Sequence, residues 1–166
     1  MTTVKLDGVW NLYYFPQEEA RVSQPSDLPT SGLKPIPAIV PGNVELDLIR
    51  AGLLPDPYYA NNIRMLKPYE VYEWWYQYTF EAIKGNDGRK TVLVFKGVDC
   101  LATYWLNDQE IGSSENMFID HNFDMTGKLD SGTNTITVRL RSPIIEAAVK
   151  DYQPYMSALD NNWEQL

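Results

Sequence analysis

The stretch of residues 72–80, YEWWYQYTF, constrains the fold more than any other part of this chain. One of its two sets of alternate positions is wholly aromatic, and it consists of Tyr72, Trp74, Tyr76, Tyr78 and Phe80. The other set is polar apart from Trp75. Such alternation is typical of a strand that buries one face. We therefore expect five rings to face the core and Trp75 to face water.

Trp75 stands alone on the polar side of this strand, so its role should differ from that of the other rings. An exposed indole at this place could cover the edge of the sheet, contact a neighbouring domain, or stack on a sugar. We favour the first two explanations over the third.

Other segments carry strand signals too. In residues 133–142, Ile136, Val138 and Leu140 alternate with threonines and arginines, which indicates one buried and one wet face. Further strands are expected in residues 90–98, which follow the turn sequence NDG at 86–88, and in the segments 6–15, 101–106, 109–112 and 117–125. Asn107 and Asp108 should form a hairpin turn, because both residue types tolerate a positive φ. Many short strands predict an all-β sandwich.

Only one segment clearly indicates a helix. Asn43 can cap it, Val44 and Leu48 lie one turn apart, and Gly52 ends it. Two long loops surround this helix, one over residues 23–42 and the other over residues 53–70. Loops of this length in a small domain are commonly functional or disordered.

The second loop holds the candidate binding residues. Their carboxylate, amides and hydroxyls could hydrogen-bond to sugar hydroxyls; they are Asp56, Tyr58, Tyr59, Asn61 and Asn62. Alternatively, the loop packs its two tyrosines on the edge of the sandwich and exposes the rest. The residues alone leave both interpretations open.

Composition excludes several function classes. The 166 residues are 44% hydrophobic, which suits one globular domain with a sizeable core. The net charge of −8 argues against nucleic acid and anionic membranes as partners. No apolar run approaches the roughly 20 residues of a membrane span. The N-terminus has no apolar signal-peptide segment, and either a cytoplasmic or a periplasmic location is compatible with that.

The residues that usually carry metal or nucleophilic chemistry are scarce. The single cysteine, Cys100, cannot form an internal disulfide or a cysteine-based zinc site, and we expect it to be a small buried side chain. His121 is the one histidine, and no G-x-S-x-G motif accompanies it. Phosphate-binding glycine loops are also missing. The sequence therefore predicts no cofactor and no metal.

Several segments together resemble a known family. They are LDGVW (6–10), VPGNVELDLIRAGLLPDPYYANN (40–62), YEWWYQYTF (72–80), LVFKGVDCLATYWLNDQEIGSSENMFIDHNFDMT (93–126) and GTNTITVRLRSP (132–143). In this order they look like the N-terminal sugar-binding domain of glycoside hydrolase family 2, and most like that of the β-mannosidases. Asp108 departs from the pattern, since this turn usually carries glycine.

The resemblance implies a galactose-binding-like jelly-roll β-sandwich over residues 3–143, with one short helix and long loops. Residues 144–166 would be an extension that leads toward an immunoglobulin-like domain and a (β/α)₈ barrel. Because the family's two catalytic glutamates lie in that barrel, we expect the chain to be a fragment without glycosidase activity. The parent enzyme would be a retaining glycoside hydrolase.

The resemblance also assigns roles to residues. In the family, the loop that matches residues 56–62 leans over the barrel and shapes the pocket for the terminal sugar, here a mannoside or a related sugar. Asp56, Tyr59 and Asn62 are the first candidates for contact, followed by Tyr58 and Asn61. A separate set is expected in turn and sheet-edge hydrogen bonds instead: Asp99, Asn116 and His121.

Three functions stay open at this point. The leading one is the accessory domain of a β-mannosidase-like hydrolase. An autonomous carbohydrate-binding module and a purely structural interaction domain are the alternatives. The choice of mannose follows from the resemblance alone, because galactosidases and glucuronidases of the family share the same N-terminal architecture.

Overall fold

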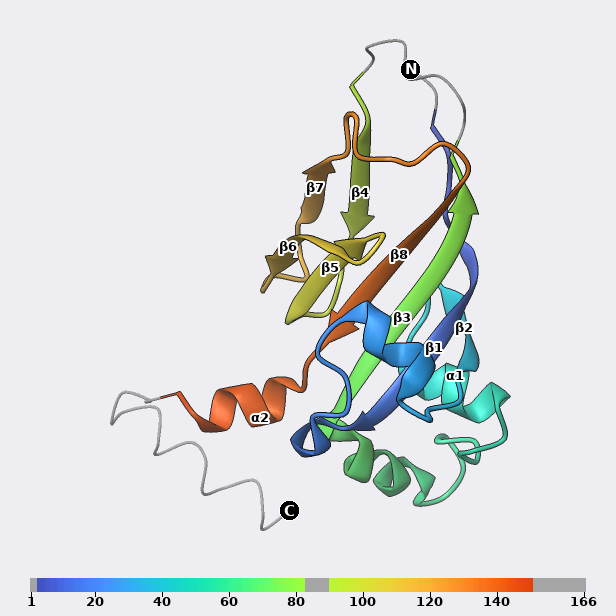
Figure 1. The fold of residues 1–166 in the computed structure, drawn as a ribbon. Coiled ribbons are helices and arrows are strands. Elements are labelled where there is room, and N and C mark those ends of the chain that lie inside the picture. The colour runs from blue at the N-terminus through green and yellow to red at the C-terminus, as the bar shows by residue number, and fades with distance from the viewer. Residues whose placement is uncertain (1–2, 83–89, 151–166) are drawn as a thin grey trace.

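Two antiparallel sheets of unequal size form the fold in the computed structural model, which describes residues 3–82 and 90–150 (Figure 1). The larger sheet contains, in spatial order, β2 (Ile36–Val40), β1 (Gly8–Pro16), β3 (Tyr72–Glu81), β8 (Thr133–Leu140), β5 (Ala102–Leu106) and β6 (Gln109–Ser114). The smaller sheet pairs β4 (Val92–Lys96) with β7 (Asp120–Asp124). The predicted all-β sandwich is confirmed. The turn predicted at residues 86–88 lies outside the described residues.

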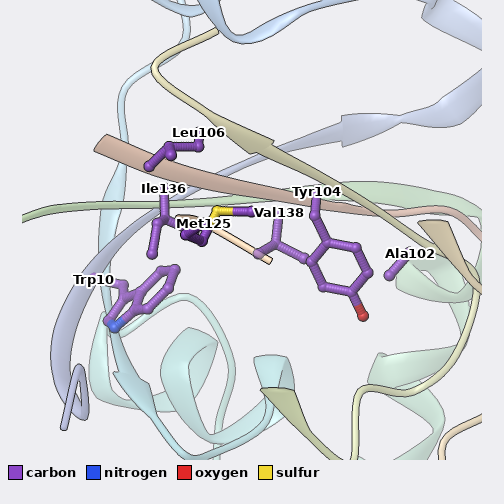
Figure 2. Packing of buried hydrophobic residues seen from close by; sticks show 7 residues of the cluster. All are labelled: Trp10, Ala102, Tyr104, Leu106, Met125, Ile136 and Val138. Carbon is purple, nitrogen blue, oxygen red and sulfur yellow. The ribbon is translucent and has the colours of Figure 1, made fainter. Parts of the chain in front are cut away.

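The main core lies between the two sheets. Seven buried residues form it, namely Trp10, Ala102, Tyr104, Leu106, Met125, Ile136 and Val138. Figure 2 shows Trp10 below Ile136 at one end of this cluster, Met125 in its middle and Tyr104 beside Val138. Phe95 and Phe123 of the small sheet pack against Tyr104, with ring centroids 4.5 and 4.9 Å from it. The buried half of the alternation predicted for β8 is confirmed, because Ile136 and Val138 are both buried in this core. The prediction of a wet face is wrong at Thr137, which pairs with Trp105 on the covered opposite face and is only 1% exposed.

A second cluster continues the same face of the large sheet toward its other end. Leu12, Ala38, Leu48, Leu54 and Trp74 are its buried members. They pack the sheet against α1 (Val44–Arg50) and against η3 (Asn62–Val71), a segment of 3₁₀ turns. The expectation for the alternating rings of β3 is confirmed: Trp74 is buried, and Tyr72, Tyr76, Tyr78 and Phe80 are half-buried against one or other of these two clusters.

Trp75 contradicts its prediction, because it is fully buried instead of exposed. The opposite face of the large sheet has a core of its own, formed by Phe15, Val22, Leu28, Trp75 and Trp105. Leu28 belongs to η2 (Pro25–Thr30), a 3₁₀ segment that covers this face. Trp75 stacks on Trp105 with a centroid distance of 5.3 Å. The polar residues on either side of Trp75 on this face of β3 suggested exposure to water, but η2 covers the part of the face where Trp75 lies.

The predicted helix and hairpin turn are both confirmed. The Asn43 side chain accepts a hydrogen bond from the Leu46 amide at 3.0 Å, as an N-cap should. Gly52 follows the helix with a φ of 72°, a conformation that glycine adopts without steric cost. At the hairpin, Asn107 and Asp108 have φ values of 49° and 66°.

Five elements lie outside the predicted set, and two of them, η2 and η3, are 3₁₀ segments that fall in the two predicted long loops. The edge strand β2 falls in the proline-rich segment 23–42, where the sequence predicts a loop. An edge position tolerates Pro37 because one side of the strand needs no ladder partner. Residues 17–19 form a short 3₁₀ turn, η1 (Gln17–Glu19). A second helix, α2 (Pro143–Ala148), opens the predicted extension 144–166, whose residues 151–166 lie outside the described part. The domain boundary at residue 143 stays a prediction.

Helix α2 lies to one side of the sheets in Figure 1. Its N-cap Ser142 accepts from the Ile145 amide at 3.2 Å and donates to the carbonyl oxygen of Glu70 at 2.5 Å. Gln17 also bonds to the start of α2. Its Oε1 accepts from the Ser142 amide at 2.7 Å, and its Nε2 donates to Oε1 of Glu146 at 3.0 Å. These bonds tie α2 to η1 and η3.

Cys100, expected to be buried, is only half-buried. Burial is the largest cause of the raised pKa of its thiol, and the nearby Asp99 carboxylate adds to it. Within residues 3–82 and 90–150, no helix is both long and apolar enough to cross a membrane. The same residues contain no group of three or more His, Cys, Asp or Glu side chains placed to hold a metal ion.

Candidate functional site

The candidate loop, residues 53–62, begins and ends at residues that are fixed to the sheet. Leu54 is buried in the cluster around Trp74, and Leu66, just after the loop, packs against the same cluster. The loop follows directly on α1, whose Leu48 is fully buried there as well. An exposed loop tip thus rises from a firmly packed base on the Trp74 face of the large sheet.

Asp56 and Asn62 shape the loop from within. Oδ1 of Asp56 accepts from the Tyr58 amide at 2.9 Å, which is the hydrogen bond of an Asx turn. Nδ2 of Asn62 donates to the carbonyl oxygen of Asp56 at 2.9 Å, which closes the loop across six positions. The Asn62 amide also donates to the Tyr59 carbonyl at 3.1 Å. Both residues therefore have a structural task, whatever else they contact.

Tyr58 and Tyr59 project from this closed loop. Their exposed fractions are 91% and 73%, so neither packs on the edge of the sandwich as the alternative interpretation required. Asn61 is exposed as well, and its carbonyl oxygen accepts from the Arg64 amide at 3.1 Å. Exposed tyrosine rings offer apolar faces for stacking and hydroxyls for hydrogen bonds.

Apolar side chains surround the loop in the sequence and are also exposed. They are Leu46 and Leu53 before the tyrosines and Ile63 and Met65 after them. A single exposed leucine is ordinary, whereas a run of exposed apolar residues within one segment marks a surface that contacts something. The loop therefore combines two aromatic rings with an apolar border, which suits a face that another protein surface covers in part.

The five candidate residues thus lie in one loop, but in two different roles. Asp56 and Asn62 hold the backbone, while Tyr58, Tyr59 and Asn61 are free to contact a ligand. Sequence reasoning ranked Asp56 and Asn62 among the first candidates and did not see this division. The signal was present for Asp56, because aspartate two residues before the amide it accepts from is a common Asx-turn arrangement.

The second set of residues behaves as expected in part. Asn116 lies before β7 and His121 lies within it, whereas Asp99 lies between β4 and β5. Oδ1 of Asn116 accepts from the Phe118 amide at 2.8 Å, and its carbonyl oxygen lies 2.7 Å from Nε2 of His121. The turn role of Asn116 and His121 is confirmed. Asp99 lines a cavity of about 410 Å³ together with Cys100 and residues 115–118.

Comparisons with known proteins agree with this architecture. The model of the family described as "Glycosyl hydrolase 2 galactose-binding domain-like" matches residues 18–163. β-Mannosidase B of Thermothelomyces thermophilus is 33% identical over 117 residues, and β-mannosidase of Capra hircus is 35% identical over 118 residues. Each match covers 70% of this chain. The crystal structure of the β-D-mannosidase from Dictyoglomus thermophilum superimposes with a TM-score of 0.76 at 34% identity and covers 93% of this chain.

The matched region is a small part of each relative. This chain spans 14% of the Thermothelomyces protein, 13% of the Capra protein and 18% of the Dictyoglomus structure. The resemblance found in the sequence is confirmed by all three proteins and by the family match. These comparisons establish the fold and the family, and the roles of the loop residues stay a prediction.

Proposed function

The chain belongs to the glycosyl hydrolase 2 family of galactose-binding-like domains, and on that premise we propose that it is the non-catalytic N-terminal domain of a β-mannosidase-like enzyme. In this role it helps to shape the sugar pocket and docks on a catalytic barrel. The substrate is a terminal mannoside or a related sugar. An immunoglobulin-like domain is the further partner within the same polypeptide.

The observation that carries the proposal is the exposure of Tyr58 and Tyr59 on a closed loop. Large rings that are 91% and 73% exposed gain no burial energy in the isolated chain. They contribute only when a partner covers them. A loop that is already closed by Asp56 and Asn62 loses little conformational entropy when it meets that partner.

The chemistry of the loop suits a sugar at the edge of a barrel pocket. A tyrosine face can pack on the apolar side of a pyranose ring, and its hydroxyl can bond to a sugar hydroxyl. Asn61 adds an amide that both donates and accepts. We assign direct contact to Tyr59, Tyr58 and Asn61, and we assign to Asp56 and Asn62 the positioning of these three.

The test uses the full-length enzyme that contains this domain, with an aryl β-mannoside as substrate. Tyr59→Ala should lower kcat/KM about tenfold, which corresponds to the loss of about 1.4 kcal/mol of interaction in the transition state. Asp56→Asn keeps an acceptor for the Tyr58 amide, so it should have a smaller effect than Asp56→Ala, which removes the Asx turn.

Phe118→Ala is the matched control, because it removes a ring that is at least as exposed as that of Tyr59 from another loop. It should leave KM and kcat nearly unchanged. Equal losses from Tyr59→Ala and Phe118→Ala would show that exposed rings matter only for general packing, and the assignment to this loop would then be wrong. Unchanged kcat and KM for Tyr59→Ala would also show that the assignment to this loop is wrong.

A further inference from the structure

We propose that a groove on the opposite face of the large sheet is a second saccharide site, and that it selects sugars bearing a protonated amine over neutral sugars and neutral sugars over uronic acids. The groove has a volume of about 390 Å³, which lies within the roughly 300–1,000 Å³ of small-ligand sites. Its main lining residues are Pro25, Pro29, Gln77, Asp108, Asp130 and Thr135.

The groove lies between two elements that are held firmly. One wall is η2, whose start is fixed by Asp27: Oδ2 of Asp27 accepts from the amides of Ser23 and Gln24 at 2.9 and 3.1 Å. The other wall is the β5–β6 hairpin turn, which belongs to a bonded network around Asn107. The Nδ2 of Asn107 donates to Asp130 at 3.0 Å and to Asn134 at 2.9 Å.

Asn107 completes this network through its own oxygen. Its Oδ1 accepts from the Thr135 amide at 2.8 Å, so the whole Asn107 amide is used inside the wall. Asn134 is almost fully buried and donates to the carbonyl oxygens of Asp130 and Gly132, both at 3.0 Å. The network therefore holds Asn107, Asn134 and Asp130 in a fixed geometry, as the wall of a selective site requires.

Among the described residues that line the groove, the charged side chains are the carboxylates of Asp108 and Asp130, and the neutral polar groups include the hydroxyl of Ser26. The carboxylate of Asp108 makes no hydrogen bond to any described residue, and Asp130 uses only Oδ2 for Asn107. Gln77 donates weakly to Thr137 at 3.4 Å, which leaves its Oε1 open. The described part of the chain places no Lys, Arg or His within 4.0 Å of Asp108 or Asp130.

The free polar groups of the groove indicate the chemical class of the ligand. A ligand must donate several hydrogen bonds at short spacing, and the ring hydroxyls of a hexose do so. A protonated amine on the ring adds charge-assisted bonds to the two carboxylates, which are about twice as strong as neutral bonds. A uronic acid would add a third carboxylate beside those of Asp108 and Asp130, and like charges repel one another at short range. Pro25 and Pro29 supply the apolar wall on which the ring can rest.

The groove is separate from the loop of the proposed function. Gln77 shares its side of β3 with Trp75, whereas the loop 53–62 is anchored in the cluster on the Trp74 side. Because neighbouring positions of a strand point to opposite faces, the thickness of the sheet lies between the two places. A sugar in the groove does not depend on the catalytic barrel or on the proposed function.

Heteronuclear NMR of the ¹⁵N-labelled chain tests the proposal, with glucosamine, mannose, glucuronic acid and ethanolamine added in turn at about pH 6, where an amine is protonated. We expect saturable shifts at Gln77, Asp108 and Thr135, with a roughly millimolar Kd for glucosamine, a weaker one for mannose and none for glucuronic acid. Ethanolamine carries the amine without a ring and should bind at least about tenfold more weakly than glucosamine.

Two variants separate the groove from other surfaces. Asp108→Asn should weaken glucosamine binding about tenfold, and it keeps the turn because asparagine tolerates a positive φ. Asp120→Asn removes the same charge from the exposed side of β7 and should change nothing. Shifts confined to residues 53–62, equal binding of ethanolamine and glucosamine, or equal effects of the two variants would each overturn the proposal.

Discussion

Replacing Trp75 by phenylalanine tests the buried face that alternation failed to predict. Nε1 of Trp75 donates to Oε1 of Glu73 at 2.6 Å, and Glu73 is only 6% exposed. Phenylalanine keeps the stack on Trp105 but removes this donor. A hydrogen bond to a charged group contributes about 1.5–3 kcal/mol, and the lost ring volume adds about 1 kcal/mol. Trp75→Phe should therefore lower the free energy of unfolding by about 3 kcal/mol.

Trp10→Phe is the matched control for this experiment. Trp10 is also buried, at 5% exposure, but its Nε1 donates to the neutral carbonyl oxygen of Leu6 at 2.9 Å. The same exchange of side chain there removes a neutral hydrogen bond of about 1 kcal/mol. The loss at Trp10 should thus be about 1 kcal/mol smaller than that at Trp75.

Urea unfolding followed by far-ultraviolet circular dichroism measures the free energy of unfolding of both variants. If their m-values agree with that of the wild type, one shared m-value is used for all three proteins. The expected order is wild type, Trp10→Phe and then Trp75→Phe, from most to least stable. If Trp75→Phe costs less than about 1 kcal/mol, or no more than Trp10→Phe, the Glu73 contact does not stabilise this face and the reasoning is refuted.

Two further predictions concern the groove wall and the buried carboxylate. Asn107→Ala removes three hydrogen bonds and places a non-asparagine residue at a φ of 49°, so urea unfolding should show a loss of about 2–4 kcal/mol; a loss under about 1 kcal/mol would contradict the network. Burial raises the pKa of Glu73 above its ordinary value of 4.5. The stability that neutral Glu73 provides is full below about pH 4.5 and is lost as the pH rises through the folded-state pKa. Because glutamine does not titrate, Glu73→Gln should gain stability relative to wild type between about pH 4 and pH 7, and a difference that is constant across this range would contradict the shift.

The period of a strand predicts which side chains share a face, but it does not predict what covers each face. Trp74 and Tyr76 pack where alternation put them, and Trp75 is correctly opposite to them. The error lay in taking the polar-looking face as wet. Its cover comes from η2, which lies far away in the sequence inside a proline-rich segment. The same prolines concealed β2, since Pro37 is compatible with an edge strand but removes the usual signal.

The sequence places the five candidate residues in one loop, and the structure agrees, but their different hydrogen-bonding roles within that loop are not predictable from it. The exposure of both tyrosines depends on how Asp56 and Asn62 close the backbone, through hydrogen bonds between residues two to six positions apart. The groove was beyond sequence reasoning altogether. Its residues come from η2, β3, the β5–β6 turn, the segment before β8 and β8 itself, and only the order of strands in the sheet brings these segments together.

The two proposed sugar contacts can be tested separately because they lie on opposite faces of one sheet. The loop depends on the packing of Leu54 and Leu48 beside Trp74, and the groove depends on the Asn107 network and on η2. No side chain belongs to both. Sites that share no partner usually respond additively to mutation. A Tyr59→Ala, Asp108→Asn double variant should therefore lose catalytic efficiency by the first change alone and groove binding by the second alone, and coupling between the two losses would mean that the sheet transmits strain from one face to the other.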